Sequence, residues 1–152
     1  MIVKSKLWEG VAKPKAIVKR SVAAAAAAIA FREADEICVT LTDDASIQAL
    51  NRRWRHQDKP TNVLSFPAAP SPASDAPRFL GDIVLAFETI EREARAQDKT
   101  IERHLAHLVV HGLLHLLGYD HAKRAQAQLM EGLETRILAT IGVADPYAIH
   151  AD

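Results

Sequence analysis

The sequence predicts an α+β fold in which a small mixed sheet is covered on one side by helices. Before residue 89, runs rich in β-branched residues alternate with runs of helical periodicity, and from there on the patterns are helical. A chain of 152 residues is the size of one domain and can bury a core without disulfides. We therefore expect residues 1–152 to form a single domain.

The first expected helix covers residues 14–30. Pro14 suits its first turn, and apolar side chains recur at helical spacing at Val18, Val22, Ala25 and Ile29. The region before this alanine-rich helix is too long and too polar for a secretory signal, so we expect a soluble helix. Residues 36–42 are rich in β-branched side chains and predict a strand. The single cysteine, Cys38, is expected there as a small buried hydrophobe in a reducing compartment.

A second helix is expected after residues 43–46, which offer capping side chains. Ile47, Leu50 and Trp54 recur at helical spacing and would form its apolar face. An aromatic side chain at such a position more often packs in a core than stacks on a nucleic-acid base. We therefore expect Trp54 to be buried.

Strands are predicted at residues 63–66 and 79–87, separated by a linker rich in Pro, Ala and Ser. This linker, residues 67–77, is expected to form a surface loop. Three helices should follow, at residues 89–97, 100–117 and 124–141. Thr100 is a candidate N-cap for the middle one, although Arg103 stands where a capping box would need Glu or Gln.

Three histidines on and just beyond helix 100–117 have the spacing of a metal site. His111 and His115 are four residues apart, so their side chains project from one helix face about 6 Å apart. Two such imidazoles reach one ion with Zn–N bonds of about 2.0–2.1 Å. Gly118 tolerates positive φ and can turn the chain back, which brings His121 to the same point. Three protein nitrogens leave a fourth position for water, as in catalytic rather than structural zinc sites.

A rival ligand set of His107, His111 and His115 would spread over two helical turns, roughly 12 Å from end to end. That span strains the reach of one ion. We therefore expect His104 and His107 to be ordinary packing or surface residues.

The spacing of the three histidines also resembles that of the metzincin peptidases. The helical metalloprotease motif, however, has Glu directly after its first histidine, as general base for water attacking a peptide bond. Here that position is Gly112, which has no side chain. Peptide hydrolysis is therefore an alternative, not the main hypothesis.

The segment from His111 to His121 resembles the signature of the YbeY family, bacterial metal-dependent endoribonucleases associated with ribosomal RNA maturation. Residues 50–67 are similar to the family's arginine-containing block, which ends in a Thr-Asp/Asn-Val-Leu-Ser-Phe-Pro run, and residues 80–84 give a third match in the same order. The resemblance implies the same α+β fold, with a zincin-like helix that carries the metal ligands.

The activity implied by this resemblance is metal-dependent cleavage of single-stranded RNA, in ribosomal RNA maturation and ribosome quality control. The implied partners are single-stranded RNA, ribosomal RNA, and the ribosome or its proteins. Because the sequence shows neither a secretory signal nor a membrane span, we expect a cytoplasmic protein. We expect one Zn²⁺ per chain, although histidine chemistry also admits other divalent metals.

Basic residues gather inside the arginine-containing block, at Arg52, Arg53, Arg55, His56 and Lys59. Guanidinium groups match phosphate oxygens, but such a cluster is also common on a solvated helix face. The resemblance selects Arg55 as catalytic, because it matches the arginine that the family's motif retains. Asn62, where many members carry Asp, is given no proton-transfer role. The sequence identifies no general base: Asp82 and Asp120 remain candidates, and for Asp120 a role in the turn or in orienting the site is favoured.

The formal net charge is zero, so the chain lacks the overall basic character of a nonspecific nucleic-acid binder. RNA would have to bind a local patch. No stretch reaches the roughly 20 apolar residues of a membrane span. Two alternatives stay open: a zinc peptidase, and a noncatalytic ribosome-associated protein stabilised by zinc.

Overall fold

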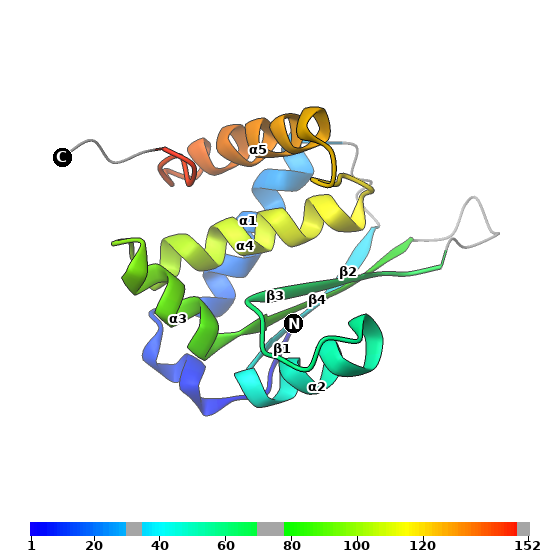
Figure 1. The fold of residues 1–152 in the computed structure, drawn as a ribbon. Helices are drawn as coiled ribbons and strands as arrows, with labels where there is room; N and C mark the ends of the chain where they lie inside the picture. Colours follow the sequence, from blue (N-terminus) through cyan, green and yellow to red (C-terminus); the bar gives the residue numbers. More distant parts are fainter. Residues whose placement is uncertain (30–34, 70–77, 149–152) are drawn as a thin grey trace.

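The computed structural model describes residues 1–29, 35–69 and 78–148, which form a four-stranded mixed sheet and its covering helices (Figure 1). The strand order is β1-β2-β4-β3. Neighbouring strands run parallel from β1 through β2 to β4, while β3 is antiparallel to β4. The strands are β1 (Ile2–Val3), β2 (Glu36–Thr42), β3 (Val63–Pro67) and β4 (Phe79–Ala86). The predicted α+β class and mixed sheet are confirmed.

The expected helices are all present, with ends that differ by a few residues from the prediction. They are α1 (Pro14–Ala28), α2 (Asp44–Arg55), α3 (Phe87–Ala96), α4 (Ile101–Leu116) and α5 (Arg124–Ala139). Thr100 is the N-cap of α4, since its side chain accepts a hydrogen bond from the backbone N–H of Arg103. Strand β1 and the short 3-10 helix Lys6–Gly10 were not predicted. Residue 30 and most of the 67–77 linker lie outside the described residues.

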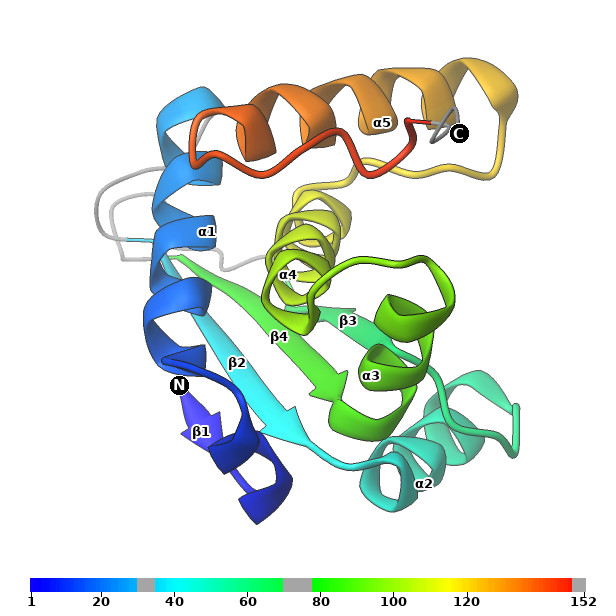
Figure 2. The same ribbon diagram turned by 90° about the vertical axis from the view of Figure 1, so that its left-hand side faces the viewer.

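Helix α4 is the centre of the molecule. Figure 2 shows it between the sheet and α5, with α1 beside it. Eleven of its residues are buried, and its apolar side chains join the sheet and the other helices in the main core. A helix that is apolar almost all round belongs in such a position. His111 and His115 therefore stand on the central, largely buried helix of the fold.

The expectation that helices cover one side of the sheet is wrong for α2. This helix lies on the face opposite α4 (Figure 1), where Ile47 packs against Leu64 and Val84. Ile83 and Leu85 alternate with these positions and join the main core instead. The second half of β4, residues 83–86, is thus buried on both faces, which explains why this part of its sequence is continuously apolar rather than alternating.

The predicted burial of Trp54 is also wrong, because 57% of the residue is exposed. The apolar cluster under α2 consists of Ile47 and its neighbours, with Leu50 and Phe66 at its edge. Trp54 lies in the last turn of α2 and is not part of this cluster. Helical spacing identified the apolar face of α2 correctly. This face extends past the apolar cluster around Ile47, so Trp54 at its far end is exposed.

Cys38 is a free thiol of intermediate exposure in β2, so it is less buried than expected. In the part of the chain that the structure describes, no helix is both long and apolar enough to cross a membrane.

Candidate metal centre

Two of the three predicted ligands stand one helical turn apart on α4. The Nε2 atoms of His111 and His115 are 3.1 Å apart, and the two rings meet nearly at right angles. Both histidines are only partly buried, although most of α4 around them is buried. The pair therefore opens to the surface from the central helix.

The chain turns sharply after α4, as predicted from the glycine. Gly118 has a φ of +97°, and its N–H donates to the carbonyl of His115 while the N–H of Tyr119 donates to that of Leu114. These two bonds form a Schellman motif, which ends a helix with a residue in the left-handed region. The turn reverses the chain and leaves His121 next to the end of α4.

The turn brings His121 to the other two histidines. Its ring centroid lies 5.0 Å from that of His115 and 5.6 Å from that of His111. One ligand nitrogen from each of the three lies within 4.8 Å of the other two. Asp120 accepts a hydrogen bond from the backbone N–H of His121, which is the turn role favoured from the sequence.

A buried carboxylate, which was not predicted from the sequence, is hydrogen-bonded to His111. Glu134 on α5 has no exposed surface, and its Oε1 is hydrogen-bonded to the Nδ1 of His111. Its other oxygen accepts from the hydroxyl of Tyr147 and from the Nε2 of His107. A signal was present: Glu134 stands on the buried face of α5, between Met130 and Leu138 at helical spacing. A charged residue at a core position needs partners.

The ionised state of Glu134 determines which ring nitrogen of His111 carries the proton and which one carries the lone pair. Burial alone would raise the pKa of Glu134, but hydrogen bonds from His107, His111 and Tyr147 lower it to about 2. An ionised carboxylate can only accept, so the Nδ1 of His111 must carry the proton. The lone pair of a neutral His111 is then on Nε2, which faces His115.

His104 and His107 do pack inside the protein, as expected. The Nε2 of His104 is 2.9 Å from Glu93, and burial lowers the pKa of His104. His107 bonds to Glu134 and to the hydroxyl oxygen of Tyr147. His107, His111 and Glu134 form a second group of closely spaced ligand atoms, but these atoms are already joined by hydrogen bonds. The rival set of His107, His111 and His115 is not brought together among the described residues.

Gly112, at the position of the peptidase glutamate, faces the sheet. A Cβ atom added there would lie 3.0 Å from a methyl group of Ile83 and 3.1 Å from the hydroxyl oxygen of Ser65. The Ser65 hydroxyl donates to the carbonyl of Gly112. The glycine thus lets α4 approach β3 and β4 closely, and no carboxylate could extend from this position toward the histidines.

The histidines line a cavity of about 730 Å³ that also contains Arg55. The guanidinium of Arg55 donates to the carbonyl of Ser65 at 2.8 Å and lies over the ring of Phe66. Asn62 lines the same cavity, and its side chain donates to Glu93. Asp82, on β4, is not among the lining residues. Of the two candidate acids, only Asp120 borders the cavity.

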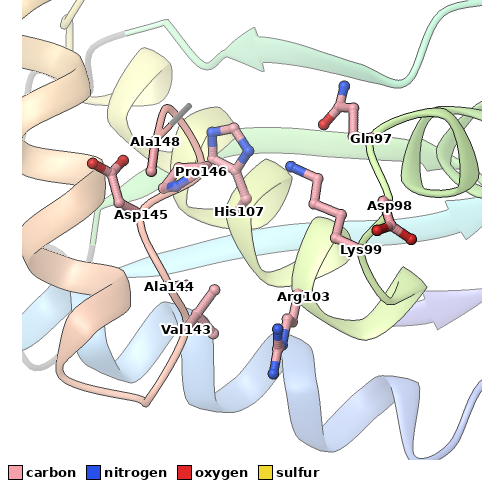
Figure 3. Close-up of a pocket in the computed structure, with 10 residues that line it drawn as sticks. All are labelled: Gln97, Asp98, Lys99, Arg103, His107, Val143, Ala144, Asp145, Pro146 and Ala148. Carbon is pink, nitrogen blue, oxygen red and sulfur yellow. The ribbon is translucent and has the colours of Figure 1, made fainter. Parts of the chain in front are cut away.

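Further cavities continue along α4 from this site. One of about 330 Å³ shares Asn62 and His111 with the histidine cavity. The next, of about 310 Å³, shares Lys99 and His107 with the second. Figure 3 shows the ammonium group of Lys99 directed toward the His107 ring at this end. The surface beside the histidines is therefore hollowed over several turns of α4.

Comparisons with known proteins agree on one family. The model of the family described as "Endoribonuclease YbeY" matches residues 5–142. An Endoribonuclease YbeY of Rhodopseudomonas palustris strain BisB18 is 51% identical, over 97% of this chain and 90% of its own length. The protein of that name from Bradyrhizobium sp. strain BTAi1 is 50% identical over the same shares. The solution structure of TM1509 from Thermotoga maritima is similar, with 25% identity and a TM-score of 0.50, covering 97% of this chain and 98% of that one.

Proposed function

Because this chain belongs to the YbeY family of endoribonucleases, and so is a hydrolase that cleaves RNA in ribosomal RNA maturation, we propose that His111, His115 and His121 hold its metal ion. The observation that carries this proposal is the 3.1 Å separation of the Nε2 atoms of His111 and His115. Two nitrogens on one tetrahedral zinc ion, each about 2.0–2.1 Å from it, are about 3.3 Å apart.

The donor set fits a metal in a second respect. Glu134 keeps the proton of His111 on Nδ1, so the nitrogen that faces the other histidines carries a lone pair. A carboxylate behind a histidine ligand is a common device, because it fixes the tautomer and the ring orientation. Three neutral imidazoles favour Zn²⁺, and we propose one zinc ion per chain, with other divalent metals as alternatives.

A metal ion bound by three protein ligands supplies Lewis-acid polarisation of a phosphoryl oxygen and activation of water near neutral pH. The chain's own contribution at the substrate is Arg55. This side chain lines the cavity that holds the histidines, and its guanidinium is anchored by the carbonyl of Ser65. A guanidinium stays charged and donates from several N–H groups, so Arg55 would bind the phosphate oxygens on which negative charge develops.

The partners and location follow from the family and form part of the proposal. We propose that the RNA is single-stranded at the cut, that the chain acts on or near the ribosome and its proteins, in ribosome quality control as well as maturation, and that it works in the cytoplasm. We also propose that residues 1–152 act as one domain. The family match over residues 5–142 supports this, because it runs through nearly the whole chain.

The test is cleavage of an end-labelled single-stranded RNA by the full chain and by a His111→Ala/His115→Ala variant purified identically. We expect the double variant to lose cleavage, and a chelator to abolish it in the unaltered chain. Leu129→Ala is the control, because it changes an exposed residue on α5 that does not line the histidine cavity. Equal cleavage by both proteins would exclude the site. Chelator-sensitive cleavage of an unfolded polypeptide, with RNA intact, would favour a peptidase.

A further inference from the structure

Trp54 has a large, mostly apolar side chain, yet it is exposed to solvent. The chain has two tryptophans: Trp8 is fully buried and donates its indole N–H to the carbonyl of Thr42, whereas Trp54 is 57% exposed. An indole left in water forgoes a large hydrophobic gain. Exposed aromatic residues of this kind are common where proteins bind ligands or partners.

The surroundings of Trp54 are positively charged. The guanidinium carbon of Arg53 lies 5.0 Å from the centre of the Trp54 ring. Four exposed cations lie around Trp54 in the sequence: Arg52, Arg53, Arg55 and Lys59. Among the described residues, none of the four forms an ion pair, whereas Arg78, Arg92 and Arg95 each pair with a carboxylate. The carboxylate nearest to them in the sequence, that of Asp58, accepts a hydrogen bond from Gln48 instead of pairing with one of these cations.

Trp54 and the four cations around it form a surface that borders the histidine cavity. Asn51 and Arg55, three residues before Trp54 and one after it, both line the cavity. A helix rises 1.5 Å per residue, so the Trp54 backbone is within one turn of both lining residues. A strand that places a phosphate against Arg55 would therefore have its neighbouring nucleotides close to Trp54.

We propose that Trp54 is a stacking platform for an unpaired base of the RNA, one that flanks the phosphate to be cut, with Arg52, Arg53 and Lys59 contacting the backbone. The inference rests on the proposed function. An aromatic ring among unpaired cations is the combination that binds single-stranded nucleic acid, since every base has a face that stacks and every nucleotide has a phosphate. The net charge of the chain is zero, so this local excess of positive charge is a specific feature.

The platform also accounts for a preference for single strands. A base in a duplex is already stacked on its neighbours and cannot lie on an indole. A flexible strand can turn one base onto Trp54 while its backbone continues toward Arg55. Hydrogen bonds to base edges are not needed, so we expect little sequence preference at this position.

The test is binding of a fluorescently labelled oligoadenylate by the full chain, with chelator present to prevent cleavage. We expect Trp54→Ala to weaken binding about 5- to 150-fold, the range for loss of one base–aromatic stack. Trp54→Phe should retain most of the affinity, and Trp54→Leu, which keeps apolar bulk without an aromatic face, should not. Leu129→Ala is the matched control, since Leu129 on α5 is also 57% exposed.

An abasic ribose-phosphate oligomer separates stacking from charge attraction. We expect Trp54→Ala and the unaltered chain to bind it equally, and Arg53→Ala to weaken binding of both oligomers. Oligoadenylate should also quench tryptophan fluorescence in the unaltered chain but not in Trp54→Phe, because Trp8 is buried.

Unchanged affinity of Trp54→Ala for oligoadenylate would overturn the platform, as would an equal loss for the abasic oligomer. Either result would stand whether or not the chain cleaves RNA, so it is separate from the test of the metal site. Conversely, cleavage that survives loss of the histidines would exclude the proposed metal site and leave the binding result intact. Thermal melting of each variant provides the check that it is folded.

Discussion

His111 and Glu134 are joined across the contact between α4 and α5 by a hydrogen bond from imidazole Nδ1 to carboxylate Oε1. The bond makes the free nitrogen of His111 the one that faces His115. It also links the candidate metal centre to the C-terminal segment, because Tyr147 donates to the other oxygen of the same carboxylate. The packing of α5 on α4 thus has a direct chemical consequence at the site.

Glu134→Gln should weaken metal binding about 10- to 100-fold, the usual cost of losing the group that orients a histidine ligand. The amide can still accept from His111 through its oxygen, but it lacks the charge that strengthens the bond. Competition with a chelator of known affinity measures the effect. Glu131→Gln, one turn earlier on α5, is the control and should bind metal like the unaltered chain. If both variants bound metal with equal affinity, a role for Glu134 in orienting His111 as a metal ligand would be excluded.

Arg55→Ala should lower kcat for RNA cleavage by about 100-fold or more, the range for loss of one donor to a developing negative charge. Metal content and melting temperature should stay close to those of the unaltered chain, since the side chain is exposed. Arg55→Lys should restore only part of the rate, because an ammonium lacks the planar fork of donors. Steady-state kinetics at saturating RNA measure this, and an unchanged kcat would rule out the catalytic role.

Gly112→Ala should destabilise the fold by about 1–3 kcal/mol, the cost of overpacking a close contact. The new methyl group would meet Ile83 and Ser65 at 3.0 and 3.1 Å. Urea denaturation measures the free energy of unfolding. Gly132→Ala on α5 is the matched control: its added methyl group meets nothing within 4 Å, so it should stabilise by about 0.5–1 kcal/mol. A neutral or stabilising Gly112→Ala would show that α4 need not approach the sheet so closely.

Asp43→Ala should reduce stability by about 1 kcal/mol at pH 7, because the Asp43 side chain caps α2 by accepting from the backbone N–H of Ser46 at 2.8 Å. That hydrogen bond lowers the pKa of Asp43 below its ordinary value of 3.8. A carboxylate whose pKa is lower in the folded state stabilises it above 3.8, and this contribution disappears as the pH falls through the folded value. The difference from the unaltered chain should therefore narrow below pH 3.8, and urea denaturation at several pH values would detect it. A constant difference down to pH 2 would contradict this.

The grouping of the three histidines was predicted from the sequence, whereas the carboxylate hydrogen-bonded to His111 was not. The spacing of His111, His115 and Gly118 sets a local geometry that hardly depends on the rest of the fold, and the structure brings the three histidines together as expected. Glu134 was missed because its contact with His111 joins two helices, and one sequence does not show which faces of two helices meet. Only its place among apolar residues of α5 marked it.

The errors at α2 have a similar origin. Periodicity identified the apolar face of this helix correctly, but could not show which side of the sheet it covers or where the sheet ends. Ile47 is buried under the sheet while Trp54 is exposed. The apolar run at residues 83–86 of β4 carried the missing information, because a strand segment buried on both faces requires a covering element on each side.

The most direct test of the central claim is the metal content of the purified full chain and of His121→Ala, measured by elemental analysis after dialysis against metal-free buffer. This account predicts about one zinc or other divalent ion per unaltered chain and a sharp loss in the variant, with the fold retained because His121 is exposed. Equal metal content in both proteins, or none in either after loading with zinc, would contradict a centre built from His111, His115 and His121.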